Sequence, residues 1–317
     1  MATRSRKRSV GIALGAGGAR GLAHVGVLKA LTRAEIPIDA IAGTSSGALV
    51  GAAYAAGQLE NFEEEVRALE WTDVLGMWDP IWPRSGLMSG RRAAERLSSF
   101  IGDFKIEDLA LPFAAVSVDL ITGDEILIER GKVADAIRAS ISIPGVFVPH
   151  RQGRRVLVDG ATRNPVPVSA LDHFDVDFRI AVNLHPAPVR EISPLPSGAL
   201  RRTRGTLASR ASDAIEARLS RFRTRSRTRP DPAESQADTP NLFEVMTATM
   251  SIIEYELARH RLALDPPDIR LEPEIKGIRT FEFHKAGAAV DAGERVVEEN
   301  LDQIRAALRR RSRRRAS

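Results

Sequence analysis

The chain has 317 residues, of which 43% are hydrophobic and 27% charged, and it contains no cysteine. This length and composition allow one large globular domain or two smaller ones, each with a buried core. The absence of cysteine excludes disulfides, thiol catalysis and cysteine-based zinc sites. Nothing in the chain calls for an oxidising compartment, so we expect a cytoplasmic location.

Two N-terminal segments have the length and apolar character of targeting or membrane segments. Residues 10–19 follow a basic N-terminus, as in a short signal peptide, but they are rich in glycine and run into Arg20. Residues 40–59 are uncharged over about the length of a bilayer span, but Gly, Ala, Ser and Thr dominate them. We interpret both segments as buried elements of a folded core.

The N-terminal part of the chain predicts two strand–turn–helix units. Val10 to Leu14 is an apolar strand, residues 15–21 form a glycine-rich loop, and apolar residues recur at three-residue steps from Leu22 to Leu31. Residues 38–56 repeat this order, with a strand, a tight turn and a helix of small residues.

The middle of the chain continues this alternation. Asn61 and Glu64 have the spacing of a capping box for a further helix, and three tryptophans mark an irregular covering segment, residues 71–86. The expected strands are residues 113–120, 125–129, 155–158 and 178–184, and the expected helices are residues 91–101 and 133–143. Strands that alternate with helices predict an α/β fold with a largely parallel sheet.

Composition changes after residue 184. We divide the chain into a basic tail (1–8), a core (9–184), an insert rich in Arg and Pro (185–240), a C-terminal helical part of the same domain (241–302) and a basic tail (303–317). The insert is expected to be a partly disordered surface loop or lid.

The net charge of +5 comes from arginine-rich segments. Ten arginines lie between Arg201 and Pro230, and six are among the last nine residues. Such segments are typical of solvated surface. They would also favour peripheral contact with an anionic membrane, or with nucleic acid. We rank nucleic acid last, because no stacking aromatics or zinc-finger spacing accompanies the charge.

A G-x-S-x-G pentapeptide spans residues 43–47, with Ser45 between Gly43 and Gly47. In this motif a serine lies on a sharp turn between a strand and a helix, where glycines avoid a collision and the helix N-terminus favours developing negative charge. An ordinary glycine-serine turn that caps a helix would show the same pattern. The predicted strand and helix on either side favour a nucleophile at Ser45.

Two further motifs lie at strand ends. Gly15, Gly17, Gly18, Ala19 and Gly21, together with Arg20, form a loop of small residues whose amides can converge on an oxyanion. A dinucleotide loop would need glycine at Arg20, and a P-loop would need a Lys-Ser/Thr pair. Asp159 and its neighbours Gly160 and Ala161 end a predicted strand, where an ordinary turn is the simplest reading. Catalytic groups also collect at such ends.

Taken together, these three ordered motifs resemble the patatin-like phospholipases, in the branch of the bacterial members and neuropathy target esterase. The resemblance is strong over residues 10–168 and looser over residues 241–293. It implies a mostly parallel sheet sandwiched by helices, with a lid or insert and a C-terminal helical region. The family loop often has three consecutive glycines, and Ala16 takes the first of these positions here.

The resemblance implies a lipid acyl hydrolase of the phospholipase A or lysophospholipase type, with no cofactor or metal. Ser45 would attack the ester carbonyl, Asp159 would accept its proton, and the amides of Gly17, Gly18 and Ala19, near Arg20, would hold the oxyanion. A Ser-Asp-His triad is the rival mechanism, and it needs a late histidine. The candidates are His173, His185, His260 and His284. A regulator that binds lipid or a partner without catalysis is the alternative function.

Overall fold

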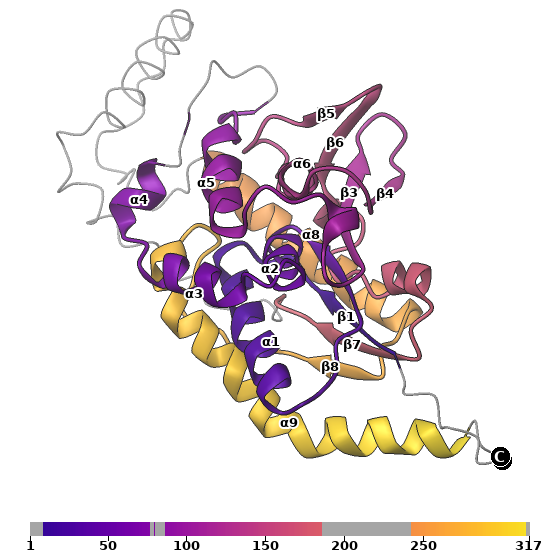
Figure 1. Ribbon diagram of the computed structural model, residues 1–317. Coiled ribbons are helices and arrows are strands. Elements are labelled where there is room, and N and C mark those ends of the chain that lie inside the picture. The colour runs from indigo at the N-terminus through magenta and orange to yellow at the C-terminus, as the bar shows by residue number, and fades with distance from the viewer. Residues whose placement is uncertain (1–8, 77–78, 80–85, 186–241, 315–317) are drawn as a thin grey trace, which may run out of the picture. The chain divides into compact units, whose positions relative to one another are not determined.

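The computed structural model describes residues 9–76, 79, 86–185 and 242–314, and these residues build a single eight-stranded sheet (Figure 1). The strand order is β5-β6-β3-β2-β1-β7-β8, and β4 pairs with β3 off this path. The strands are β1 (Val10–Leu14), β2 (Ala40–Thr44), β3 (Phe113–Asp119), β4 (Glu125–Ile128), β5 (His150–Gln152), β6 (Arg155–Asp159), β7 (Phe178–Val182) and β8 (Ile269–Leu271). The pairings β3-β2, β2-β1, β1-β7 and β7-β8 are parallel. The pairings β3-β4, β3-β6 and β5-β6 are antiparallel.

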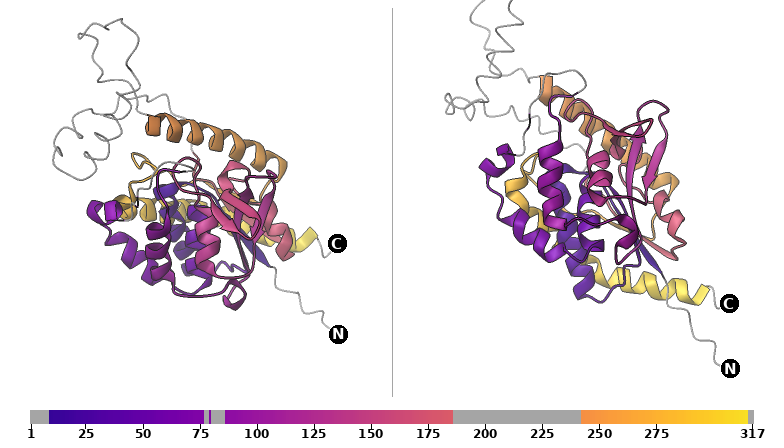
Figure 2. Two further views of the ribbon diagram at one scale, coloured as in Figure 1. Left: turned by 90° about the horizontal axis from the view of Figure 1, so that it is seen from above. Right: turned by 45° about the horizontal axis from the view of Figure 1, so that its top comes forward.

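Helices cover both faces of this sheet (Figure 2). They are α1 (Ala23–Arg33), α2 (Ser46–Ala55), α3 (Leu59–Arg67), α4 (Trp71–Gly76), α5 (Arg91–Ile101), α6 (Val133–Ser140), α8 (Leu242–Leu264) and α9 (Ala286–Arg314). Successive strand residues point to opposite faces. Ile12 and Leu14 therefore join the larger core with α1, α2 and α9, while Ala13 packs in a smaller core with Ala258 and Leu262 of α8. The predicted α/β architecture, with helices on both sides of a mostly parallel sheet, is confirmed.

Helix α9 belongs to this core because it packs closely along α1. Gly26 of α1 and Gly293 of α9 lie where a Cβ would overlap the backbone of the other helix. Lys29 of α1 pairs with Glu294 of α9 at 3.4 Å and with Glu63 of α3 at 2.6 Å. Within the residues that the structure describes, no helix is long and apolar enough to cross a membrane.

Contacts within the chain define two compact units, Met1–Ala187 with Met250–Ser317, and Pro188–Thr249. Of the second unit, the structure describes residues 242–249, where α8 begins. The predicted insert therefore lies outside the described residues except at His185, as do its arginines, Trp78 and Trp82.

The start of one helix differs from the sequence prediction. The capping box is wrong: α3 begins at Leu59, and the Asn61 side chain donates to the Phe100 carbonyl at 2.8 Å instead of capping a helix. Helix α9 continues to Arg314, so residues 303–314 of the predicted basic tail are helical. Asn61 is used in a tertiary contact, which a short motif search does not detect.

Candidate active site

Ser45 lies on the turn between β2 and α2 in a strained backbone conformation, with φ 55° and ψ −119°. A Cβ at Gly43 would come within 2.5 Å of the Ala48 amide nitrogen, and a Cβ at Gly47 would overlap the Leu14 carbonyl oxygen. Glycine is therefore required on both sides of the turn. The Ser45 amide donates to Ser140 Oγ at 2.8 Å, which fixes the turn against α6. The strained geometry is that of a nucleophile elbow.

The register of the sheet brings Asp159 beside Ser45. Thr44 of β2 pairs with Val116 of β3, and the next residue of β3, Ser117, pairs with Asp159 at the end of β6. Ser45 and Asp159 are thus at the same level on either side of β3. The Ser45 hydroxyl donates to Asp159 Oδ2 at 2.7 Å.

Strand β6 runs antiparallel to β3, so the parallel-sheet argument made from the sequence does not explain the position of Asp159. The Asp159 carboxylate lies beside Ser45 because β6 ends at this level, where the chain turns at Gly160. A Cβ at Gly160 would lie 2.5 Å from the Val116 carbonyl oxygen. The amide of Ala161 donates to Asp159 Oδ1 at 2.8 Å, which leaves Oδ2 for Ser45.

Asp159 has the properties of a general base. Its side chain is 3% exposed, and burial raises the pKa of its carboxyl to about 7, against the hydrogen bonds from Ala161 and Ser45, which lower it. A carboxylate with this pKa attracts a proton near neutral pH far more strongly than an exposed aspartate does.

The glycine loop follows β1 and becomes a short 3₁₀ turn, η1 (Gly18–Leu22). Gly18 lines a pocket with Ser45, and the backbone hydrogen bonds of the described residues engage neither the Gly17 nor the Gly18 amide. The Ala19 amide differs from the prediction, because it donates to the Thr280 carbonyl at 2.8 Å. Of the three predicted oxyanion donors, Gly18 is the one that lines this pocket.

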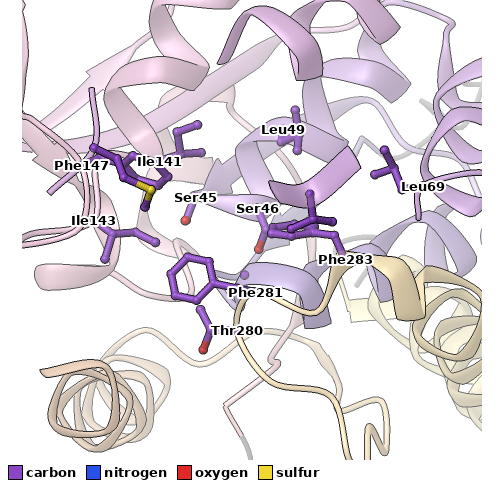
Figure 3. A pocket seen from close by; sticks show the side chains of 13 residues that line it. Ser45, Ser46, Leu49, Leu69, Ile141, Ile143, Phe147, Thr280, Phe281 and Phe283 are labelled. Carbon is purple, nitrogen blue, oxygen red and sulfur yellow. The ribbon is translucent and has the colours of Figure 1, made fainter. Parts of the chain in front are cut away.

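The pocket beside Ser45 is mainly apolar, and its empty space, which includes space open to solvent, is about 760 Å³. Figure 3 shows Ser45 and Ser46 at adjacent positions among the residues that line it. Its remaining lining residues are Gly18, Leu49, Leu69, Val74, Met88, Ile141, Ile143, Phe147, Thr280, Phe281 and Phe283. No charged side chain is among them, so the pocket suits a hydrocarbon chain attached to a group that reacts at Ser45.

A buried polar cluster behind the glycine loop escaped the sequence analysis. Glu254 of α8 lies 3.7 Å from Nδ1 of His185, and the field of Glu254 also acts on Arg20. Burial, together with the charge of Asp159, raises the pKa of Glu254 to about 7. Burial lowers the pKa of Arg20, whose Nε donates to the Gly17 carbonyl at 3.4 Å. The Arg20 side chain thus stabilises the glycine loop through the Gly17 carbonyl.

The histidines do not form a triad with Ser45 among the described residues, because the Ser45 hydroxyl bonds to Asp159. His24 contacts the Gly15 carbonyl through Nε2 at 2.7 Å, and burial lowers its pKa to about 4. Burial lowers the pKa of His185 to about 3. His173 and His260 lie on the surface beside glutamates. Among the residues that the structure describes, no group of three or more His, Asp and Glu side chains is arranged to hold a metal ion.

Comparison with known proteins identifies the class that this fold and site represent. The model of the patatin-like phospholipase family matches residues 12–172. An uncharacterized NTE family protein of Mycobacterium tuberculosis is 34% identical over 328 residues, which cover 92% of this chain and 91% of the relative. The chain therefore belongs to the patatin-like phospholipase family, whose members are associated with hydrolysis of lipid esters.

Other relatives match over smaller parts of their length. A second uncharacterized NTE family protein of Mycobacterium tuberculosis is 43% identical over 174 residues, 54% of this chain and 29% of the relative. The neuropathy target esterase sws of Drosophila melanogaster is 31% identical over 183 residues, 56% of this chain and 13% of that protein. The solved structure of VipD from Legionella pneumophila aligns over 95% of this chain and 77% of its own, with a TM-score of 0.36 and 12% identity.

Proposed function

We propose that this protein is a serine acyl hydrolase that cleaves fatty-acyl esters of lipids, as a phospholipase A or lysophospholipase does. The single observation that carries the proposal is the 2.7 Å hydrogen bond from Ser45 Oγ to Asp159 Oδ2 beside an apolar pocket. Family membership supports lipid ester hydrolysis in general. The roles of the two residues rest on their geometry.

In the proposed mechanism, Ser45 Oγ attacks the ester carbonyl carbon as its proton passes to Asp159 Oδ2. The carbonyl oxygen becomes an oxyanion held by the amides of the glycine loop. Collapse of this intermediate breaks the bond to the alcohol, which leaves with the proton from Asp159, and the acyl group stays on Ser45. Water then attacks the acyl-enzyme with Asp159 again as base, which releases the fatty acid and restores the Ser45 hydroxyl.

The rate should depend on pH through Asp159, which accepts a proton only when ionised. Because burial raises the pKa of this carboxyl to about 7, kcat/KM should rise with pH through neutrality and level off at about pH 8. Glu254 titrates in the same range, so the midpoint belongs to the pair. The profile should be measured with an uncharged ester at constant ionic strength. A rate that falls with increasing pH, or is unchanged from about pH 5 to 9, contradicts the assignment.

The direct test of function is the release of fatty acid by the wild-type protein from phospholipid vesicles, lysophospholipid and a nitrophenyl ester. We expect hydrolysis of the nitrophenyl ester and of at least one lipid. A folded protein that binds vesicles but hydrolyses none of these esters would instead support the alternative, a regulator that binds lipid without catalysis. Circular dichroism is the control for folding.

We also propose peripheral contact with an anionic membrane from the cytoplasmic side, motivated by the arginines of residues 201–230 and of the C-terminus. In the same assay, hydrolysis of vesicles that contain anionic lipid should fall as salt screens these charges, while hydrolysis of the soluble ester should change little. Vesicle hydrolysis that is indifferent to salt and to anionic lipid would exclude an electrostatic anchor.

A further inference from the structure

The hydroxyl of Ser46, next to the proposed nucleophile, is buried without a hydrogen-bond partner. The residue is 6% exposed, and its Oγ is one of four buried side-chain N or O atoms among the described residues that lack a partner. The others are His24 Nδ1, Asn164 Oδ1 and His185 Nε2. Of these residues, Ser46 is the one that lines the pocket beside Ser45.

A buried hydroxyl that makes no hydrogen bond destabilises a folded protein. Such groups are uncommon in native proteins, and a catalytic role is one explanation for them. The pocket around Ser46 offers mostly hydrocarbon, with no charged side chain. A partner for this hydroxyl is therefore expected to enter the pocket with the substrate.

The position of Ser46 favours donation to a negatively charged oxygen. Ser46 is the first residue of α2, where the helix N-terminus favours negative charge. Its hydroxyl lies against the glycine loop, because a Cβ at Gly21 would overlap Ser46 Oγ. Ser45 and Ser46 both line the pocket, at adjacent positions (Figure 3). Ser46 thus lies where the elbow meets the loop that would hold the oxyanion.

The state of the glycine loop gives a second reason for a side-chain donor. The Ala19 amide is bound to the Thr280 carbonyl, and of the two other predicted donors Gly18 lines the pocket. Another donor at this point would replace the Ala19 amide among the oxyanion donors that the sequence predicts. Ser46 Oγ is a donor in this region, and it is free of other hydrogen bonds.

We infer that Ser46 is a further catalytic residue: its hydroxyl donates a hydrogen bond to the carbonyl oxygen of the scissile ester as that oxygen becomes an oxyanion. This inference rests on the proposed function. The interaction forms in the transition state, so its loss should lower kcat more than it raises KM. Because the hydroxyl has no partner in the unliganded protein, its loss should not lower stability.

The test uses Ser46→Ala in the full chain, with Ser99→Ala on the exposed face of α5 as the matched loss of a serine hydroxyl. We expect kcat for a nitrophenyl ester to fall about 10- to 100-fold in Ser46→Ala, near the lower range for loss of an oxyanion donor, with KM close to wild type and Tm equal to it or higher. Ser99→Ala should retain wild-type kinetics. Ser46→Cys keeps a weak donor of similar size and should lie between wild type and Ser46→Ala.

A trifluoromethyl ketone with an alkyl chain distinguishes transition-state stabilisation from other effects. Ser45 Oγ adds to its carbonyl carbon, the proton passes to Asp159, and the ketone oxygen becomes an oxyanion. Its inhibition constant should rise in Ser46→Ala by the factor by which kcat/KM falls. An active wild type with unchanged kcat in Ser46→Ala, or with unchanged ketone affinity, would overturn the inference alone. A wild type that hydrolyses no ester would overturn the proposed function and this inference with it.

Discussion

Replacement of Ser45 by alanine should reduce ester hydrolysis on the order of 10⁶-fold, to the residual rate left by binding and the oxyanion donors. The reason is that Ser45 is the group placed to attack, on a turn with φ 55° and with its hydroxyl 2.7 Å from Asp159 Oδ2. Initial rates with a nitrophenyl ester and with lysophospholipid measure the effect.

The control for Ser45→Ala is Ser99→Ala, with near-ultraviolet and far-ultraviolet circular dichroism for both variants. If the Ser45→Ala protein keeps its fold and more than about a tenth of the wild-type kcat, a different nucleophile carries the reaction. If Ser45→Ala loses both activity and its circular dichroism signal, the variant is not folded and does not test the role of Ser45. Ser45→Gly, which relieves the strained φ, would then serve as the test.

Asp159→Asn should lower kcat on the order of 10⁴-fold, because the amide keeps the shape of the side chain but accepts no proton. Its carbonyl oxygen can still receive the Ala161 amide, now 2.8 Å from Asp159 Oδ1. The pH dependence set by Asp159 should disappear from the residual rate. A variant that retains wild-type kcat, or the same pH profile, would show that Asp159 is not the base.

The same variant should be more stable than wild type at alkaline pH. The pKa of Asp159 is about 7 in the folded protein and about 4 in an unfolded chain, so the folded state holds the proton more tightly. Stability from this group is present below the unfolded pKa and is lost as pH rises through the folded pKa. Thermal unfolding of both proteins should therefore diverge between about pH 4 and 8, with Asp159→Asn more stable at the upper end.

Most strands and helices could be predicted from the sequence, because each one depends on the hydrophobic pattern of neighbouring residues. The first strand, Val10–Leu14, was predicted to the residue, and the strand–turn–helix order around Ser45 was correct. The pairing of the strands was harder to predict from the sequence. That β6 runs antiparallel to β3 depends on the turn that joins β5 to β6, and no periodicity within the strand encodes this turn.

The site divides in a similar way. Ser45, Asp159 and the glycine loop are marked by short motifs, and the structure brings Ser45 and Asp159 within hydrogen-bond distance. The Thr280 carbonyl and Glu254 come from segments more than 200 residues along the chain from Ser45, with no motif of their own. The free Ser46 hydroxyl is also invisible in the sequence, since it depends on what surrounds the side chain.

The central claim is that Ser45 forms a covalent acyl-enzyme with Asp159 as its base, and a fluorophosphonate with an alkyl chain tests it most directly. Ser45 Oγ would displace fluoride from phosphorus and leave a stable adduct, which intact mass and peptide mass spectrometry locate. We predict one adduct, on Ser45, that forms in wild type, much more slowly in Asp159→Asn and not in Ser45→Ala. An active wild-type protein that is labelled at another residue, or labelled equally fast in Asp159→Asn, would contradict it.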